Sequence, residues 1–246
     1  MKTLKEYIEE GILAGREKTK SRLESDMTDT LVKKWAEENL SLFGENIFKI
    51  DNNGKIINKD NNSLNLSKVT NIPEYIKFGD IDGNIYFGSE TLKQLSQEQL
   101  PTGQETMFIG GKTGTIPSFV YTCNSFYIND FPQYIKHIEP ITLKMNSKGY
   151  RKPTISLDNT NIQLSDLLNI TVEGDVYSLY IKKTPAAEQI KKEIKKLDKK
   201  GEKTGECLYP KYLDDLFKNF PGLRFIYLSE RTTLEHNPKT LQWYLF

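Results

Sequence analysis

The chain contains little of what metal sites and disulfide frameworks require. Among its 246 residues there are two cysteines and two histidines. Cys123 and Cys207 do not form a CxxC motif, and neither His137 nor His236 lies at a metal-ligand spacing from the other or from a cysteine. The sequence therefore indicates neither a disulfide framework nor a cysteine-based zinc site, and we expect buried, inert thiols.

Long apolar runs and a strong net charge are missing as well. No stretch approaches the roughly 20 apolar residues that span a bilayer, and the first thirty residues lack the apolar core of a signal peptide. The formal net charge is +1, so no strong global field favours nucleic acid or a membrane surface. We expect a protein that has no membrane partner and that stays in a cytoplasm or inside a particle.

What the chain does contain predicts a folded protein that begins with helices. Charged residues make up 27% and aromatic residues 11% of the sequence, unlike a disordered chain. In MKTLKEYIEEGILAG, the apolar residues Leu4, Ile8 and Ile12 recur every four positions, which predicts a short amphipathic helix. A second helix is predicted from Thr28, as N-cap, to Gly44.

The segment IFKIDNNGKII predicts a β-hairpin. Two apolar runs that favour strands flank Asn53-Gly54, and this dipeptide is the strongest short-range signal for a hairpin turn. A polar loop follows it.

Two pairs of segments indicate an internal repeat. Ile81–Tyr86 resembles Val172–Tyr177 at an offset of 91 residues, and Ile72–Ile76 resembles Ile116–Val120 at an offset of 44. Both offsets are close to multiples of 22 or 23, within the 20 to 29 residues of a leucine-rich repeat. The alternative is that isoleucine-proline followed by an aromatic residue is a common way to enter a strand. If the repeat exists, the strands around Ile85 and Val176 share one sheet, and both residues face the core.

The C-terminal quarter predicts two helices and two strands. Thr184 as N-cap and Pro185 at the first helical position start a helix that Gly201 is expected to end. Its apolar stripe consists of Ala187, Ile190, Ile194 and Leu197. A further helix is predicted over residues 210–220, and LRFIYL and TLQWYLF then predict strands that close the end of the sheet.

These elements together predict an α+β fold with three regions. An N-terminal helical segment covers residues 1–44, and a hairpin with a short leucine-rich-repeat-like β-solenoid covers residues 45–183. A C-terminal cap of helices and strands covers residues 184–246. The cap is expected because a solenoid must cover its exposed end coils.

The chain also resembles proteins of tailed phages that infect Bacteroidetes, including crAss-like phages. MKTLKEYIEEGILAG is similar to a short N-terminal segment found on otherwise different proteins of these phages. KVTNIPEYIKFGDIDGNIYF and ITVEGDVYSLYIKK resemble the degenerate leucine-rich-repeat proteins that such phages encode. In these, a proline-containing turn precedes a GDF-type strand, which here becomes Gly83-Asn84-Ile85 and Gly174-Asp175-Val176. The resemblance implies a structural or interaction role and transfers no catalytic residue.

The segment GGKTGT at residues 110–115 suggests chemistry but lacks the necessary partners. A phosphate-binding P-loop needs a glycine five residues before its Gly-Lys pair, and position 106 is threonine. The KTG element of penicillin-interactive enzymes works with a nucleophilic S-x-x-K, and no serine in the chain has lysine at the third following position. We interpret GGKTGT as a turn between strands, and predict that Lys112→Ala leaves fold and function nearly unchanged.

Three further candidates are also better explained by structure than by chemistry. DIDGN at residues 80–84 has its glycine at position 4 of a calcium loop, where position 6 is required, so we interpret it as a turn. A dyad of Cys123 and His137 is conceivable, but Cys123 lies in a strand-like aromatic run that favours a packed thiol. Asp214 and Asp215 are adjacent on a helix, where their side chains diverge and favour a solvated surface.

A lysine-rich helix is the main charge feature. Residues 182–203 contain nine lysines and four acidic residues, a balance of +5 that leaves the rest of the chain at −4. The lysines recur at helical spacing and form one face: Lys191, Lys192, Lys195, Lys196, Lys199 and Lys200. This face is a candidate for phosphate contact, although it lacks the arginines and interleaved aromatic residues of a nucleic-acid surface. The alternative is a solvated helix face.

The functional prediction is a non-enzymatic phage protein, associated with the virion, that acts as a structural or protein-interaction module. It implies no cofactor, no metal and no catalytic residue, and its partner is a phage or host protein. The expected location is the virion or the host cytoplasm. Leu4, Ile8 and Ile12 are the candidate docking residues, because so short a helix needs a surface to pack on. The alternatives are an internal virion protein that contacts packaged DNA through the lysine face, and an enzyme of unrecognised class.

Overall fold

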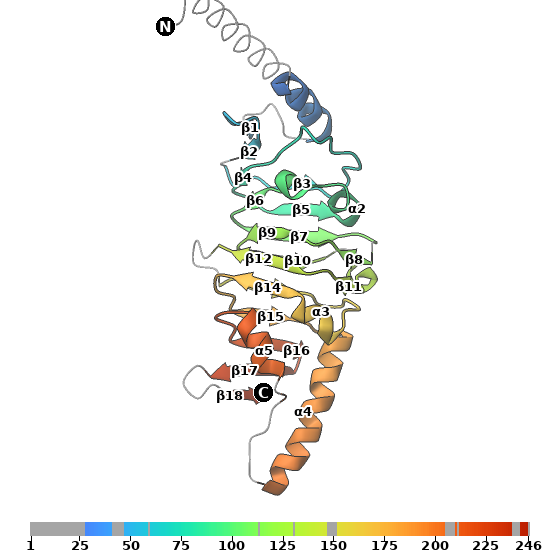
Figure 1. The fold of residues 1–246 in the computed structure, drawn as a ribbon, viewed down its shortest axis with the longest axis vertical. Coiled ribbons are helices and arrows are strands. Elements are labelled where there is room, and N and C mark those ends of the chain that lie inside the picture. Colours follow the sequence, from blue (N-terminus) through green and yellow to red (C-terminus); the bar gives the residue numbers. More distant parts are fainter. Residues whose placement is uncertain are drawn as a thin grey trace, which may run out of the picture.

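Short strands stacked along one axis form the body of the molecule, with helices at both ends (Figure 1). This computed structural model describes residues 28–40, 47–58, 60–112, 114–129, 131–146, 152–204, 210, 212–237 and 242–245. The predicted α+β class is confirmed.

Two sheets of stacked strands make up the body. The larger sheet has nine strands, in the order β3 (Leu64–Leu66), β5 (Ile85–Gly88), β7 (Thr106–Gly110), β10 (Ser125–Ile128), β13 (Thr154–Ser156), β15 (Ser178–Tyr180), β16 (Phe225–Ser229), β17 (Thr232–Asn237) and β18 (Gln242–Leu245). The second has five, in the order β4 (Asp80–Ile81), β6 (Thr102–Gly103), β9 (Val120–Cys123), β12 (Ile141–Met145) and β14 (Ile170–Glu173). Both follow chain order, so the chain visits the sheets in turn and adds one layer at each pass.

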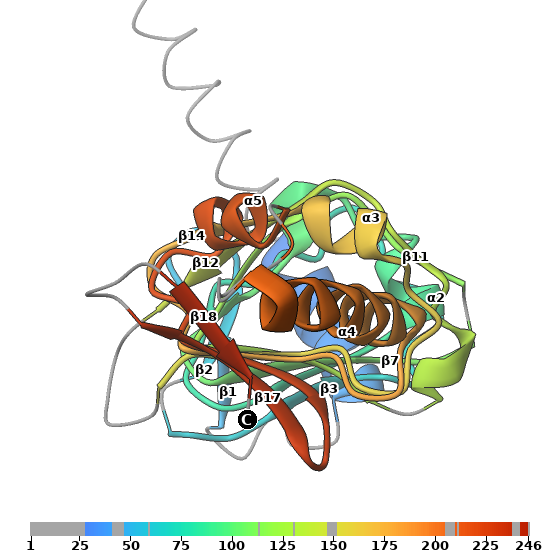
Figure 2. The same cartoon turned by 90° about the horizontal axis from the view of Figure 1, so that it is seen from below.

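Short elements lie in the connections from β5, β7, β10 and β13 of the larger sheet to the next strand of the smaller one. They are α2 (Ser89–Leu92), the 3₁₀ helix η1 (Gln97–Gln99), β8 (Thr115–Ile116), the 3₁₀ helix η2 (Pro132–Tyr134), β11 (His137–Ile138) and α3 (Leu164–Leu168). β8 and β11 pair in parallel with each other. Viewed along the stack, successive layers overlie one another (Figure 2).

The larger sheet holds its layers in register through an inward-facing row. Parallel pairing aligns Leu64, Ile85, Met107, Phe126, Ile155, Leu179 and Ile226. All seven side chains are fully buried. Neighbours in this row lie 21, 22, 19, 29, 24 and 47 residues apart along the chain. Successive side chains of a strand point to opposite faces of the sheet, so a shift by one residue would turn the buried side chain outward. Burial of this apolar row therefore fixes the register of the layers.

The predicted repeat identifies the correct sheet but is out of register. β5 and β15 belong to one sheet, and Ile85 and Val176 are both fully buried, as expected. Val176, however, lies in the corner between β14 and β15, and the residue that aligns with Ile85 is Leu179. The corner after Glu173 is longer than the corner after Ile81, so similarity of the two corner sequences misplaces the strand that follows.

A helix and a hairpin cover the N-terminal end of the stack. Residues 28–39 are helical, which confirms the second predicted helix in outline, although Thr28 already lies within the helix and Leu40 lies beyond it. This helix buries Val32, Trp35 and Ala36. β1 (Phe48–Ile50) and β2 (Ile56–Asn58) pair antiparallel, which confirms the predicted hairpin. Its connection is the five-residue loop 51–55 instead of a two-residue turn, with Gly54 at φ +72°. The predicted N-terminal helix lies outside the described residues.

The C-terminal elements close the opposite end. In α4 (Pro185–Thr204), the Thr184 hydroxyl accepts a hydrogen bond from Ala187 N–H, which confirms the predicted N-cap. α4 runs obliquely along the long axis beside the last strands (Figure 1), and Ala187, Ile190 and Ile194 on it are buried. The prediction that Gly201 ends this helix is wrong, because α4 continues to Thr204. An interior glycine costs a helix only about 1 kcal/mol, which favourable neighbouring residues can offset.

The remaining C-terminal predictions are confirmed in outline. α5 (Tyr212–Asn219) buries Leu213 and Leu216, and Gly222, with φ +74°, follows its end. β16 and β18 correspond to the two predicted strands. The intervening β17 was not predicted, and it turns the sheet antiparallel.

Candidate functional site

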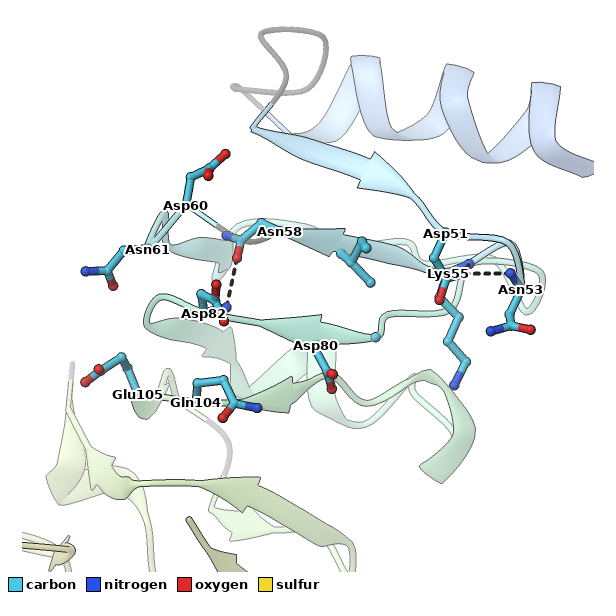
Figure 3. A pocket seen from close by; sticks show the side chains of 12 residues that line it. Asp51, Asn53, Lys55, Asn58, Asp60, Asn61, Asp80, Asp82, Gln104 and Glu105 are labelled. Atoms are coloured by element: carbon cyan, nitrogen blue, oxygen red, sulfur yellow. Dashed lines mark hydrogen bonds between the residues drawn. The ribbon is translucent and has the colours of Figure 1, made fainter. Parts of the chain in front are cut away.

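An acidic groove opens on the surface near the N-terminal end of the stack (Figure 3). It lies between the β1–β2 hairpin and the first layers of the smaller sheet and has a volume of about 1030 Å³. Its charged lining consists of Asp51, Asp60, Asp80, Asp82, Glu105 and Lys55. Five carboxylates and one ammonium group therefore share one concave surface, which we call the acidic groove.

Local hydrogen bonds fix both ends of this groove. The Asp51 carboxylate accepts hydrogen bonds from Asn53 N–H at 2.8 Å and Lys55 N–H at 2.9 Å, and so shapes the hairpin loop. The bond from the Lys55 backbone is the main cause that lowers the pKa of Asp51. At the other end, Asp82 N–H donates to Asn58 Oδ1 at 2.8 Å. Asp51 is therefore held ionised, and the Asp82 backbone is tied to the hairpin.

Most of the groove's carboxylates have no neutralising partner. Among the described residues, the carboxylates of Asp60, Asp80 and Asp82 form no ion pair. Gln104 Oε1 is buried at the groove and accepts no hydrogen bond from the described part of the chain. Within that part, no group of three or more His, Cys, Asp or Glu residues is arranged to hold a metal ion. The groove therefore suits a partner with several positive charges spread over its length.

DIDGN forms one wall of this groove and is a corner, as predicted. Asp80 and Ile81 form β4, and Ile85 starts β5, so residues 82–84 turn the chain from one sheet to the other. A Cβ at Gly83 would overlap the backbone carbonyl of Asn62, so the close approach of two layers requires glycine here. Sequence reasoning identified this turn but not the acidic surface that it joins.

The lysine face of α4 lies at the opposite end of the molecule (Figure 1). Lys192, Lys195 and Lys196 are exposed and form no ion pair with a described residue, whereas Lys191 pairs with Glu188. The side chains of Lys199 and Lys200 lie outside the described residues. Four of the six predicted lysines thus have described side chains on α4, while their contact with phosphate stays a prediction. We call these four, Lys191, Lys192, Lys195 and Lys196, the lysine face.

GGKTGT is a turn, as predicted. Gly110 ends β7, Gly111 has φ +116°, and β8 starts at Thr115. Lys112 Nζ lies 5.4 Å from the ring centre of Phe131 and 6.0 Å from that of Tyr134. The lysine therefore contacts aromatic rings on the surface, a weak cation–π arrangement.

The remaining candidate residues for catalysis do not form the pairs that catalysis would need. Cys123 is fully buried in β9, and this burial raises the pKa of its thiol to about 12. His137 instead contacts Asp166, with Nδ1 2.6 Å from Oδ1. Asp214 and Asp215 are exposed on α5, and Asp215 pairs with Lys218 at 3.1 Å. Neither the Cys123–His137 dyad nor an Asp214–Asp215 acid/base couple forms. Leu4, Ile8 and Ile12 lie outside the described residues.

An aromatic row on the larger sheet was not predicted from the sequence. The outward positions aligned by pairing are Tyr86, Phe108, Tyr127, Ser156, Tyr180 and Tyr227. Tyr86 and Phe108 stack with ring centres 4.8 Å apart and planes within 5°, and Tyr180 and Tyr227 stack at 4.2 Å. The sequence signal is an aromatic residue directly after five of the seven inward-facing residues, all except Leu64 and Ile155, and it becomes visible only once the register is known.

Comparison with known proteins gives no assignment: no family model, no curated protein and no solved structure matches the chain. Within the described residues, no helix is long and apolar enough to cross a membrane.

Proposed function

We propose that this protein is a non-enzymatic structural or protein-interaction module, built as a degenerate leucine-rich-repeat-like β-solenoid and associated with a phage virion. The observation that carries the proposal is the stack of layers, in which each pass of the chain adds one in-register strand to both sheets. Such stacks bury one continuous core and present long, regular surfaces, and proteins of this kind commonly use those surfaces to bind other proteins.

Corner asparagines support the repeat assignment. Asn124 Nδ2 donates to the Asn146 carbonyl at 2.8 Å, and Asn146 Nδ2 donates to the Gly103 carbonyl at 3.0 Å. Each bond joins a corner of one layer to the backbone of another. At the end of β2, Asn58 Oδ1 instead accepts a hydrogen bond from the Asp82 N–H of the corner beside it. At a corner between two sheets, some backbone N–H and C=O groups have no hydrogen-bond partner on a neighbouring strand. A side-chain amide can form the hydrogen bond that such a group needs.

The arrangement of charge supports an interaction role over catalysis. The acidic groove and the lysine face are extended surfaces, and the candidate nucleophile Cys123 lies inside the core. Contact with packaged DNA through the lysine face is the second candidate, favoured by three exposed lysines that form no ion pair with an acidic residue in the described part of the chain. An enzyme of unrecognised class is the third.

Mass spectrometry of purified virions tests the proposal, with full-length protein compared with a variant that lacks residues 1–15. We expect the full-length protein in particles, and the variant to keep its melting temperature while it is lost from particles. Unchanged incorporation with a large loss of stability would make the first fifteen residues an ordinary part of the fold. A thermal-shift screen with nucleotides, metal ions and cofactors tests the enzyme alternative, because a tight ligand raises the melting temperature by mass action.

A further inference from the structure

The molecule separates its charge along its long axis. The acidic groove lies beside the β1–β2 hairpin at one end, and α4 runs past the last parallel strands at the other (Figure 1). The net charge of the whole chain is only +1, so this separation creates a dipole and almost no net repulsion between copies. Complementary potentials at two ends of one molecule steer those ends toward each other in neighbouring copies.

Three carboxylates of the acidic groove and three ammonium groups of the lysine face form no ion pair within the described part of the chain. Asp60, Asp80 and Asp82 form no ion pair with a described residue, and neither do the exposed Lys192, Lys195 and Lys196. Groups that already pair internally would lose those partners on docking. These six can instead gain partners from a second molecule without breaking contacts that the structure describes.

The lysine face is also accessible to a groove of this size. The side of α4 that carries Ala187, Ile190 and Ile194 is buried against the stack, whereas Lys192, Lys195 and Lys196 are exposed and project away from it. Two turns of a helix, about 10 Å wide and 11 Å long, occupy on the order of 900 Å³. The groove has a volume of about 1030 Å³, which admits the lysine-bearing side of such a segment.

We propose that the lysine face of one copy docks into the acidic groove of a second copy, so that the chains associate head to tail. The proposal rests on the structural role proposed above and names its partner as this chain itself. Each contact uses one groove and one lysine face, which leaves the other groove and the other lysine face of the pair open. A heterologous contact of this kind builds an open filament or, if the rotation closes, a ring.

The first experiment is sedimentation velocity of the full-length protein at low and high salt. In about 20 mM NaCl we expect species larger than the monomer, whose fraction rises with protein concentration. In about 500 mM NaCl, where the screening length falls to about 4 Å, we expect the monomer. A monomer in about 20 mM NaCl at a protein concentration of about 1 mM would overturn the proposal.

Two charge-reversal variants then identify the surfaces. The helix variant carries Lys192→Glu, Lys195→Glu and Lys196→Glu, and the groove variant carries Asp60→Lys, Asp80→Lys and Asp82→Lys. Each variant alone has like charges on both surfaces, so each is expected to remain monomeric at low salt. An equimolar mixture is expected to associate again, because each lysine or glutamate face now meets a groove of opposite charge in the other variant.

The matched control carries Lys68→Glu, Lys93→Glu and Lys136→Glu, which changes the net charge as much as the helix variant does. These lysines are exposed, line neither surface and form no ion pair with a described residue. We expect the control to associate as the wild type does, and circular dichroism confirms that each variant is folded. Loss of association in the control, or a mixture that stays monomeric, would reject the head-to-tail contact.

The outcomes also separate this inference from the proposed function. A protein that is monomeric at low salt but present in virions retains its module role and loses only the self-association. If the lysine face served nucleic acid instead, wild type would stay monomeric, and DNA retention would fall in the helix variant alone.

Discussion

His137 Nδ1 lies 2.6 Å from Asp166 Oδ1, and this contact links β11 to α3. The two side chains differ in exposure, with 53% of His137 but only 4% of Asp166 open to solvent. Asp166 also accepts hydrogen bonds from Ile138 N–H at 3.2 Å and from Gln163 N–H at 2.7 Å. The carboxylate is therefore the centre of this contact, and the histidine is its outermost partner.

Asp166→Ala is expected to reduce the free energy of unfolding by about 2–3 kcal/mol, because it leaves two backbone N–H groups without their acceptor. His137→Ala is the control on the same contact and is expected to cost less than about 1 kcal/mol, since the imidazole is half exposed. Urea unfolding measures both. Equal losses in the two variants would show that the histidine contact, and not the backbone bonds, carries the stability.

The GGKTGT turn offers a matched pair of variants. Lys112→Ala removes an exposed cation–π contact and is expected to cost less than about 1 kcal/mol. Gly111→Ala is expected to cost at least about 2 kcal/mol, because φ is +116° and the new Cβ would overlap Ser89 Oγ and lie 3.1 Å from Ser89 N. Thermal unfolding distinguishes them. Binding of ATP or covalent capture of a β-lactam that disappears in Lys112→Ala would contradict the assignment of this segment as a turn.

The aromatic row is expected to stabilise the stack. Phe108 contacts Tyr86 on one neighbouring strand and Tyr127 on the other, with ring centres 4.8 and 5.6 Å apart. Phe108→Ala is therefore expected to reduce the free energy of unfolding by about 1–2 kcal/mol, measured by urea unfolding. Thr106→Ala, at the next outward position of the same strand, is the control and should change it by less than about 0.5 kcal/mol. A Phe108 variant as stable as this control would show that the stacked rings serve another purpose.

His236 makes the C-terminal cap sensitive to acid. Burial in β17 lowers the pKa of this histidine, and the charge of Asp214 only partly opposes the effect. A lowered folded-state pKa means that the unfolded chain binds the proton more readily. Stability is therefore complete above the unfolded value of about 6.5 and falls as the pH drops below it toward the lowered pKa.

Replacement of His236 by phenylalanine tests this expectation. The ring contacts Trp243 with centres 4.9 Å apart and planes tilted by 55°, and phenylalanine keeps an aromatic contact there without a titratable group. Unfolding free energies measured from pH 7.5 to about pH 5 should decline less steeply in His236→Phe than in the wild type. Parallel pH profiles would assign the acid sensitivity to other groups.

Local signals in the sequence predicted most individual elements. The Thr184 N-cap, the hairpin around Asn53-Gly54 and the apolar stripe of Ala187, Ile190 and Ile194 each depend on residues near one another in the chain. The register of the layers could not be obtained in this way. Corner lengths vary between layers, so the similar strings around Gly83 and Gly174 align two corners and displace the strands that follow.

Of the two charged surfaces, likewise, only the one formed by residues close together in the sequence could be predicted. The lysine face was predictable because its residues follow helical spacing within one element. The acidic groove was not, because Asp51, Asp82 and Glu105 come from three separate layers and meet only after the layers stack. The contact between Asp166 and His137 was not predictable for the same reason, since 29 residues separate them in the sequence.

The spacing of the layers also sets an order of assembly. Leu179 pairs with Ile155, 24 residues earlier, but its other partner, Ile226, lies 47 residues further along the chain. The entropic cost of closing a loop rises by only about 0.6 kcal/mol when the loop length doubles. This cost adds to the free-energy barrier for pairing β16, the last parallel strand, with β15. During synthesis the strands up to β15 can pair as they emerge, whereas β16 must wait for α4 and α5. A ribosome-bound chain would therefore complete the acidic groove, whose lining ends at Glu105, before the lysine helix that starts at Pro185 has been synthesised.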